Sequence, residues 1–410
     1  MDGSTRPNIV LIFMDDLGYG DLGCTGSPLI STPHIDRLAA EGLQMRQMYS
    51  TSPTCTPSRA GLLTGRYAQR VGLPRVIFPA DPEGLCGWER TIAGVLSDVG
   101  YRCGIYGKWH LGARPEHNPL RHGFEEFYGL PYSNDMDPLN LYVNADRIEA
   151  AVDQSTLTRR YTDQAMDFIS RHADEPFFVY LPHTMPHIPL HVEEDFRGTS
   201  RAGTYGDTVE CLDHHVGRLV DHVEQLGLAE RTLFLVTSDN GPWFEGRTGG
   251  LRGRKIDTYE GGIRMPFVAR WTGTIQPGRV CDDVRSLLDV FPTLATLAGA
   301  QIPDDRPIDG VDMSGLLRGE ELPPRPPLYF FSHWHLNAVR DGRWKVHVDR
   351  FPTNDLRELP QLFDVVADPE ESYNLASLHP EVLDRMLGLV DAFGREIEAQ
   401  REDAVARARS

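Results

Sequence analysis

The sequence predicts an α/β protein with two parts: a large domain with a central, mostly parallel mixed sheet between helices, and a small C-terminal antiparallel α+β domain. Two observations predict this organisation. Short apolar runs alternate with amphipathic stretches through roughly the first 300 residues, which is typical of a parallel sheet covered by helices. Residues 301–327 are then rich in Pro, Asp and Gly, which indicates a connector. We therefore expect domains over residues 1–310 and 311–410.

The strands expected in the large domain are short and continuously apolar. Strands that are buried on both faces of a sheet have this character, because neither face meets water. Helices between them are indicated by a helical period or by end signals, such as Thr32-Pro33 at a start and Gly100 at an end. The expected strands are Asn8–Phe13, Cys103–Tyr106, Phe177–Leu181, Thr232–Thr237 and Pro266–Trp271, and the expected helices are His34–Glu41, Thr91–Val99 and one within 207–226.

The small domain is expected to hold a four-stranded antiparallel sheet and one helix. A helical period of apolar residues runs from Val382 to Ile397, so one face of this final helix should pack on the sheet. The charged tail, residues 400–410, is expected to fray. The expected strands are Leu328–Ser332, Asn337–Arg340, Trp344–Val348 and Leu362–Val365.

Composition limits the partners and the compartment. The formal charge of −18 favours solubility and argues against nucleic acid as a partner. No run approaches the roughly 18 apolar residues that cross a membrane. The first apolar run begins at Ile9, which leaves no room for a signal peptide, so we expect a cytoplasmic protein as written, or a periplasmic or secreted one if a leader was removed. The oligomeric state is left open.

The six cysteines form no CxxC pair and no zinc-ligand spacing. Most are therefore expected to be reduced, buried thiols. Cys55 is the exception, because it begins the run Cys55-Thr56-Pro57-Ser58-Arg59. Pro57 is typical of the first helical position, which places Cys55 at the start of a helix, where the positive end favours an anion. Arg59 would lie one turn further on.

Polar side chains follow four of the expected strands at the point where each strand ends. In open α/β sheets, ligands bind beyond the carboxyl ends of the strands. Alternation along an extended chain would also put Lys108 and His110 on one side, with Trp109 opposite. We therefore expect one site that gathers carboxylates, a cation and imidazoles. The residues that follow the strands are Asp15 and Asp16, Lys108 and His110, His183 and His187, and Asp239 and Asn240.

Asp15, Asp16, Asp239 and Asn240 supply the hard oxygen ligands that suit Ca²⁺ or Mg²⁺ rather than zinc. Any one of these residues, taken alone, is at least as often a helix cap or a turn residue. The adjacent pair Asp15-Asp16 after a buried strand is harder to explain in that way, because two like charges repel unless a cation lies between them.

The motif Cys55-x-Pro57-Ser58-Arg59-x-x-Leu62-x-Thr64-Gly65 resembles the type I sulfatase signature at every fixed position. Residues 104–112, Gly-Ile-Tyr-Gly-Lys-Trp-His-Leu-Gly, resemble the second signature of that family. The resemblance runs from Pro7 to about Leu375. Segments 20–24, 127–133 and 259–264 are similar to the branch of arylsulfatase A and N-acetylgalactosamine-6-sulfatase. Asn134 departs from that branch, which often has His there.

The resemblance implies an alkaline-phosphatase-like fold and a role for each matching residue. A separate formylglycine-generating enzyme would convert Cys55 to Cα-formylglycine. His187 lies in the family's His-x-Pro context, whereas His183 and His191 do not. The implied metal ligands, for Ca²⁺ or alternatively Mg²⁺, are Asp15, Asp16, Cys55 in its modified form, Asp239 and Asn240; Arg59 would stabilise the formylglycine hydrate, Lys108, Lys255 and Ser133 would contact sulfate, and His110 and His187 would be the acid/base pair.

These roles imply a sulfatase that hydrolyses a sulfate monoester, of an aryl group or of a sugar or lipid, to an alcohol and inorganic sulfate. The path would run through a covalent sulfo-formylglycine intermediate. Two alternatives stay open at this point. One is a phosphate-ester hydrolase on the same fold, although the combination of Lys108 and Lys255 with His110 and His187 favours sulfate. The other is a non-catalytic binding protein on the same scaffold.

Overall fold

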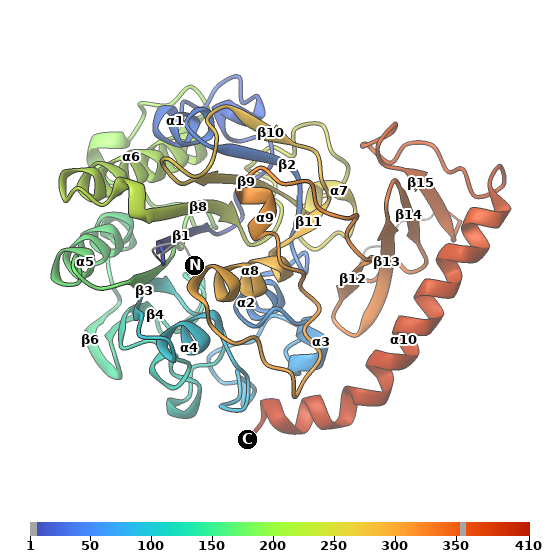
Figure 1. Cartoon of the computed structure of the whole chain (residues 1–410), viewed down its shortest axis with the longest axis horizontal. Helices are drawn as coiled ribbons and strands as arrows, with labels where there is room; N and C mark the ends of the chain where they lie inside the picture. Colours follow the sequence, from blue (N-terminus) through green and yellow to red (C-terminus); the bar gives the residue numbers. More distant parts are fainter. Residues whose placement is uncertain (1–5, 353–357) are drawn as a thin grey trace.

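The computed structural model describes residues 6–352 and 358–410 and contains two sheets (Figure 1). Within these residues the large sheet has eleven strands in the order β10-β2-β9-β8-β1-β7-β3-β4-β5-β6, with β11 paired to β2. Its strands are β1 (Asn8–Met14), β2 (Leu43–Tyr49), β3 (Arg102–Lys108), β4 (Glu126–Leu130), β5 (Asn140–Val143), β6 (Asp146–Ala150), β7 (Phe177–Pro182), β8 (Thr232–Ser238), β9 (Arg264–Arg270), β10 (Arg279–Cys281) and β11 (Arg285–Ser286).

The centre of the large sheet is parallel. Strands β8, β1, β7, β3 and β4 are neighbours and run in one direction, whereas β9 pairs antiparallel with both β8 and β2. All five expected strands are therefore present, within a few residues of the expected ends. Their shared direction brings the carboxyl ends of the central strands to one edge of the sheet.

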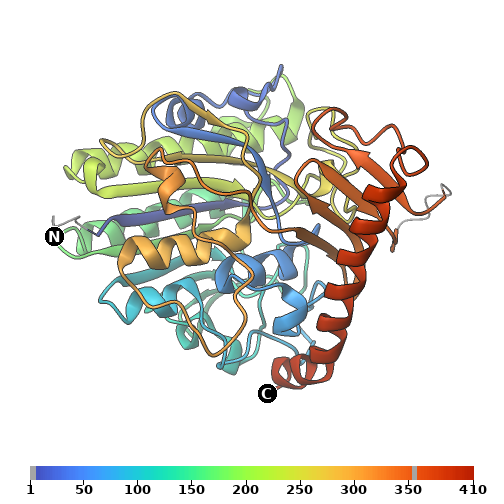
Figure 2. The same cartoon turned by 45° about the vertical axis from the view of Figure 1, so that its right-hand side comes forward.

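Helices cover both faces of the large sheet, as the apolar strands require (Figures 1 and 2). Along β1, Val10 and Ile12 pack toward one face, and Ile9 and Leu11 toward the other. The first face carries α1 (Pro33–Ala40), α5 (Leu157–Arg171) and α6 (Gly203–Gln225), and the second carries α2 (Cys55–Thr64), α4 (Ile92–Ser97), α8 (Val290–Ala298) and the short α9 (Ser314–Leu317).

The small sheet is antiparallel and has the order β12-β13-β14-β15. Its strands are β12 (Leu328–Ser332), β13 (His335–Asp341), β14 (Trp344–His347) and β15 (Gln361–Asp364). The final helix, α10 (Pro380–Ala408), packs along it through residues such as Met386 (Figure 2). This confirms the expected α/β fold with a small antiparallel domain. The connector reaches the large core through Met313 and Leu316, and the domain boundary at 310/311 stays a prediction.

The expectation that residues 400–410 fray is wrong. Helix α10 continues to Ala408, and both Ala404 and Ala408 are buried. They pack beside Gly72, which follows α3 (Ala68–Val71) and has φ +80°, so that a Cβ there would meet the Ala404 carbonyl oxygen at 2.2 Å. Small residues thus let the end of the chain dock on the large domain, and the tail's charges conceal this contact in the sequence.

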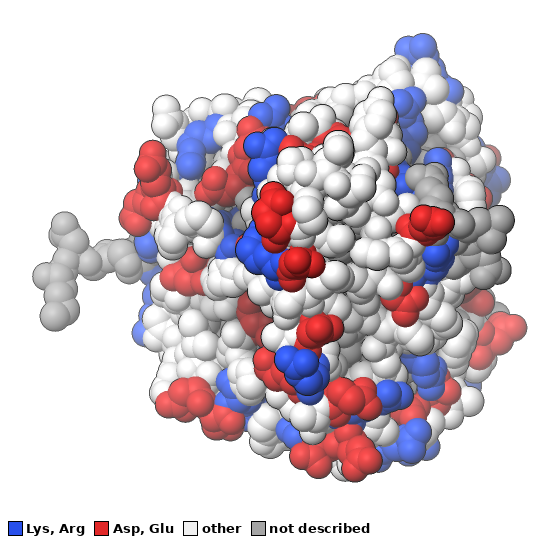
Figure 3. Space-filling view, turned by 90° about the vertical axis from the view of Figure 1, so that its right-hand side faces the viewer, with Lys and Arg blue, Asp and Glu red and all other residues white. Residues whose placement is uncertain are grey.

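In the part of the chain that the structure describes, no helix combines the length and the apolar character that a membrane crossing requires. On the face that carries the small domain, basic and acidic side chains are interspersed over the surface (Figure 3). All six cysteines are free, as expected.

Candidate active site

The carboxyl ends of four neighbouring strands deliver polar residues to one place. Asp15 and Asp16 follow β1, which lies between β7 and β8, and Lys108 is the last residue of β3. The segment after β7 carries His187, and the segment after β8 carries Asp239 and Asn240. The strand ends therefore bring these six residues to one place, and the contacts between them are given below.

Cys55 enters this place from the start of α2. Thr54 is the residue before the helix and Cys55 the first within it, so Pro57 occupies the third helical position rather than the first. The Cys55 Sγ lies 3.7 Å from Asp15 Oδ1, and the residue is 2% exposed. Burial raises the pKa of the Cys55 thiol to about 12, although Lys108 and Lys255 oppose this shift. The unmodified thiol is therefore protonated at neutral pH and is a poor nucleophile.

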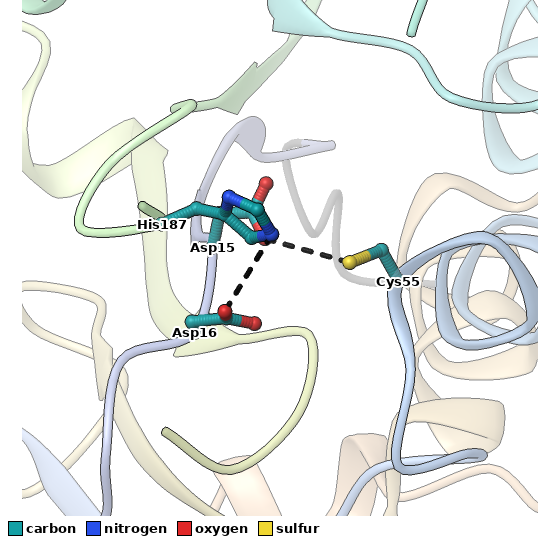
Figure 4. A group of neighbouring side chains, drawn as sticks. All are labelled: Asp15, Asp16, Cys55 and His187. Atoms are coloured by element: carbon teal, nitrogen blue, oxygen red, sulfur yellow. Dashed lines mark hydrogen bonds and ion pairs between the residues drawn. The ribbon is translucent and has the colours of Figure 1, made fainter. Parts of the chain in front are cut away.

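Four side chains form a compact group of possible metal ligands. Asp15, Asp16, Cys55 and His187 each offer a ligand atom, and these atoms all lie within 4.8 Å of one another. Figure 4 shows the four side chains pointing toward one another from three segments, with Asp15 and Asp16 adjacent on one of them. Carboxylates buried this closely repel one another and favour a bound cation.

Asn240 and Asp239 complete the oxygen-rich side of the group. Asn240 Nδ2 donates to Asp16 Oδ1 at 2.6 Å, and Asp239 Oδ1 accepts the Asp16 N–H at 3.1 Å. The Oδ1 of Asn240 is buried and has no hydrogen-bond partner among the described residues. Leaving a buried acceptor unpaired costs about 1–3 kcal/mol. An unpaired amide oxygen beside these carboxylates fits a hard cation such as Ca²⁺ or Mg²⁺.

Three cations face the three carboxylates. Lys108 Nζ lies 2.5 Å from Asp15 Oδ2, and Lys255 Nζ lies 2.7 Å from Asp16 Oδ2. The Arg59 guanidinium lies 3.0 Å from Asp239 Oδ2 and 3.2 Å from Asp15 Oδ2. Although burial opposes it, the Asp16 carboxylate raises the pKa of Lys255 above its usual range, so this lysine stays charged. The site is thus a buried lattice of opposite charges, to which a bound divalent cation would add positive charge toward an anionic substrate.

Ser133 also reaches this lattice. Its Oγ lies 3.0 Å from Lys108 Nζ, and the residue is 2% exposed. An ammonium has only donors, so the Ser133 oxygen accepts this bond and its own O–H can still donate to an oxygen atom. The structure therefore places Ser133 beside one of the two lysines expected to contact sulfate.

His110 is held as a neutral imidazole with one free nitrogen. Its Nε2 lies 3.0 Å from the Ile77 carbonyl oxygen, which can only accept, so Nε2 carries the hydrogen. Its Nδ1 is buried and has no hydrogen-bond partner among the described residues. Burial, together with Lys108 and Arg59, holds the pKa of His110 well below 6.5. His110 has φ +58°, so strand alternation does not explain its place beside Lys108.

His187 presents its other nitrogen to the carboxylates. Its Nδ1 lies 2.5 Å from the Ile188 carbonyl oxygen, and its Nε2 lies 3.7 Å from Asp16 Oδ2. Burial holds the pKa of His187 below its ordinary value, although Asp16 and Asp15 oppose this shift. His187 is thus the histidine of its segment that joins the compact group.

The two competing histidines lie outside that group. His183 is fully buried against the Tyr161 ring of α5, at 6.3 Å between ring centroids, and burial lowers its pKa to about 3. His191 lies further along the chain and is partly exposed. Of these three histidines, the structure therefore places only His187 in the compact group.

A second group of residues of the kinds that bind metals is held together by hydrogen bonds. Glu193, Cys211 and His215 each offer an atom within 4.8 Å of the others. His215 Nδ1 lies 3.0 Å from Arg218 Nη1, and a guanidinium only donates, so the hydrogen on Nε2 is given to Glu193 Oε1 at 2.6 Å. Both ring nitrogens are used, and the group ties the segment around residue 193 to α6 without a metal.

Comparisons with known proteins identify the family. Residues 7–300 match the Sulfatase family, and residues 254–387 match the family described as N-sulphoglucosamine sulphohydrolase, C-terminal. The chain is 41% identical to arylsulfatase A of Bos taurus, over 94% of this chain and 87% of that protein. It is 36% identical to N-acetylgalactosamine-6-sulfatase of Canis lupus familiaris, over 95% of this chain and 80% of that protein.

A solved structure described under the metabolism of multiple glycosaminoglycans by Bacteroides thetaiotaomicron superposes with a TM-score of 0.88. It is 29% identical and covers 96% of this chain and 100% of its own. Family match, sequence relatives and structural likeness all extend over most of the chain. The chain therefore belongs to the sulfatase family: it is a sulfuric ester hydrolase with an alkaline-phosphatase-like fold, in the branch of arylsulfatase A and N-acetylgalactosamine-6-sulfatase.

Proposed function

We propose that this enzyme hydrolyses a sulfate monoester to an alcohol and inorganic sulfate through a covalent intermediate on residue 55, after Cys55 has been converted to Cα-formylglycine by a formylglycine-generating enzyme. One observation carries the proposal. The buried Cys55 at the start of α2 lies against Asp15, within a lattice that contains Lys108, Lys255 and Arg59. A nucleophile at this position attacks a sulfuryl group whose negative charge is stabilised by these cations.

Asp15, Asp16, Asp239 and Asn240, with an oxygen of residue 55, would hold a Ca²⁺ ion or alternatively Mg²⁺. When bound, this ion supplies charge neutralisation and polarises a sulfuryl oxygen. The unpaired Asn240 Oδ1 supports this assignment.

The first half of the reaction forms the intermediate. The aldehyde of residue 55 adds water to give a geminal diol, which Arg59 stabilises. One hydroxyl gives its proton to a carboxylate of the site as its oxygen attacks sulfur. Lys108, Lys255 and the Ser133 hydroxyl hold the sulfuryl oxygens as the ester S–O bond breaks. His187 gives a proton to the leaving oxygen, and the alcohol departs. Sulfate is then bonded to residue 55.

The second half restores the aldehyde. His110 accepts the proton of the remaining hydroxyl on Nδ1, which has no other partner among the described residues. The bond between the residue's carbon and the sulfate oxygen breaks, and inorganic sulfate leaves. The low pKa of His110 keeps this nitrogen unprotonated and ready to accept. A serine at position 55 lacks the second hydroxyl and therefore has no such release step.

The substrate that we propose is the sulfate ester of a sugar or of an aryl alcohol. The relatives support this range: one is an N-acetylgalactosamine-6-sulfatase, another is an arylsulfatase, and the structural neighbour is described under glycosaminoglycan metabolism. The experiment described next also tests the alternative, phosphate-ester hydrolysis.

The experiment measures steady-state hydrolysis of para-nitrophenyl sulfate and para-nitrophenyl phosphate after co-expression with a formylglycine-generating enzyme. We expect wild type to cleave the sulfate and Cys55→Ala to lose at least about 10³-fold in kcat. Cys103→Ala, which removes a buried thiol outside the site, is the matched control and should stay active. Cleavage of phosphate but not sulfate by the modified enzyme would support the alternative.

Cys55→Ser tests the release step. The variant should accumulate enzyme that carries one sulfuryl group, visible by mass spectrometry of the intact protein, and should stop after a single turnover. Sustained multiple turnover by Cys55→Ser would contradict the proposed intermediate.

A further inference from the structure

Lys255 lies on a loop, residues 252–260, whose tip is fixed within the large domain. The Lys255 N–H donates to the Pro242 carbonyl oxygen at 3.0 Å, and the Ile256 N–H donates to the Pro53 carbonyl oxygen at 2.9 Å. Pro242 comes shortly after Asn240, and Pro53 shortly before Cys55. The tip of the loop is therefore bonded to the two segments that border the candidate site.

The base of the same loop is held by the small domain. Arg252 Nη1 donates to the Glu371 carbonyl oxygen at 2.9 Å, and the Glu260 N–H donates to Glu371 Oε2 at 2.7 Å. The Tyr259 ring stacks on His347, at 4.4 Å between centroids, and its hydroxyl donates to Gln361 Oε1 at 2.9 Å. Every one of these partners lies C-terminal to the connector.

Glu371 is the centre of these contacts. Its Oε1 accepts from Lys345 Nζ at 3.0 Å and from His347 Nε2 at 2.7 Å, and Glu371 is fully buried. Lys345 also lies 3.1 Å from Glu260 Oε1, so one buried ammonium bridges two carboxylates. Glu260 begins the short helix α7 (Glu260–Ile263), which lies between the two sheets in Figure 1.

We propose that Glu371 is a positioning residue for Lys255: through Glu260 and Arg252 the small domain sets where the Lys255 ammonium stands relative to the sulfuryl group. This rests on the proposed function for the role of Lys255. The loop has two fixed ends, and the carboxylate holds one of them from another domain. The small domain is then part of the apparatus that binds sulfate, although none of its described residues contributes a side chain to the lattice of charges.

The test variant is Glu371→Gln, which keeps the size of the side chain and removes its charge. Lys345 then loses one of its two carboxylate partners. The side-chain amide of the new glutamine must also turn its NH₂ group toward hydrogen-bond donors that Glu371 accepts from in wild type. We expect kcat/KM for para-nitrophenyl sulfate to fall on the order of 10-fold, because small misplacements of a binding group cost rate. If Glu371→Gln does not fold, Glu371→Asp keeps the charge, shortens the reach and takes its place.

A double-mutant cycle with Lys255→Ala separates positioning from general damage. If Glu371 acts through Lys255, Glu371→Gln should change kcat/KM by less than about 2-fold once Lys255 is Ala. The matched control is Glu89→Gln, which removes one carboxylate from the buried Arg66–Glu89 pair, at 2.6 Å, away from the loop. Glu89→Gln should leave kcat/KM near wild type. Equal losses from Glu371→Gln with and without Lys255 would overturn the inference.

A readout without turnover distinguishes this inference from the proposed function. Amide hydrogen exchange of peptides over residues 252–262 should become faster in Glu371→Gln and not in Glu89→Gln. Binding of inorganic sulfate, followed by calorimetric titration, should weaken in Glu371→Gln and in Lys255→Ala without adding in the double variant. A wild type that binds sulfate but cleaves no ester overturns the proposed function alone. Unchanged exchange and unchanged sulfate affinity in Glu371→Gln overturn the positioning role alone.

Discussion

The molecule contains two buried clusters of charged residues. They have similar compositions, but they differ in whether every buried polar atom has a hydrogen-bond partner. In the strand-end cluster Lys108 lies between Asp15 and Ser133, and in the joint between the domains Lys345 lies between Glu260 and Glu371; both lysines are fully buried. The strand-end cluster contains three buried atoms without a hydrogen-bond partner among the described residues: Asn240 Oδ1, His110 Nδ1 and Arg59 Nε. In the joint, each carboxylate oxygen of Glu260 and Glu371 has a partner.

This difference indicates what each cluster is for. A buried polar group without a partner costs stability, so it persists where a ligand or a reaction uses it. A cluster whose members all have partners fixes geometry and has nothing left to offer a substrate. The first cluster is therefore expected to bind substrate and metal directly, and the second to stabilise the domain joint and hold the 252–260 loop in place.

Replacing Lys108 or Lys345 with methionine should give the largest difference between the two clusters. In Ca²⁺ buffer, Lys108→Met should lower kcat by about 10²–10³-fold, because a preorganised cation at the sulfuryl group is lost. Its free energy of unfolding should change little, since the Asp15 carboxylate keeps Arg59. Lys345→Met should lower the free energy of unfolding by about 3–5 kcal/mol, because two buried carboxylates lose their shared partner.

The two lysine variants are compared by denaturant titration and by the rate per folded molecule. Lys345→Met should keep its rate per folded molecule within about 10-fold of wild type. The distinction between the clusters fails if Lys108→Met loses as much stability as Lys345→Met and keeps its rate.

Metal addition should affect only the strand-end cluster. Ca²⁺ at 100 times its dissociation constant stabilises a protein with one site by about 2.7 kcal/mol. We expect the thermal midpoint of wild type and of Lys345→Met to rise with Ca²⁺, and that of Asn240→Ala to rise much less. Repeating the titration with Mg²⁺ identifies the preferred ion. A full Ca²⁺ response in Asn240→Ala would place the ion elsewhere.

Acid should weaken the joint by a smaller amount. Burial alone would raise the pKa of Glu371, but Lys345 and His347 lower it further, and the net pKa lies below its ordinary value of 4.5. A carboxyl with a lower pKa in the folded state contributes stability above pH 4.5 and loses it as the pH falls below that value.

The difference in unfolding free energy between wild type and Glu371→Gln should therefore shrink by about 1.4 kcal/mol for each pH unit as the pH falls below 4.5. Denaturant titrations across this range measure it. A difference that stays constant with pH would show that Glu371 contributes no charge to the joint.

The central strands and the strand-end cluster were predictable from the sequence because their signals are local. The run Asn8–Met14 is apolar throughout, and its burial on both faces follows directly. Asp15 and Asp239 stand at strand ends, and parallel strands bring such ends together. Strand β2, Leu43–Tyr49, was not predicted, because Gln44, Arg46 and Gln47 interrupt its apolar pattern.

The joint and the state of His110 could not be predicted. Glu260 and Glu371 are 111 residues apart in the sequence. In its own segment, each looks like an ordinary solvent-exposed glutamate. The free nitrogen of His110 depends on the backbone carbonyl of Ile77, which no side-chain pattern reveals. Long-range pairing and backbone acceptors are properties of the fold, so only the structure supplies them.

The burial of Cys55 has a consequence for how the enzyme is made. A residue that is 2% exposed at the start of a packed helix offers no surface to a second enzyme once the chain has folded. Under the proposed chemistry, Cys55 must therefore be converted to formylglycine while its segment is unfolded. The rate of this conversion then competes with the rate of folding. Two preparations with the same melting temperature can then differ severalfold in specific activity, and the host's speed of synthesis decides which fraction of the molecules will ever turn over.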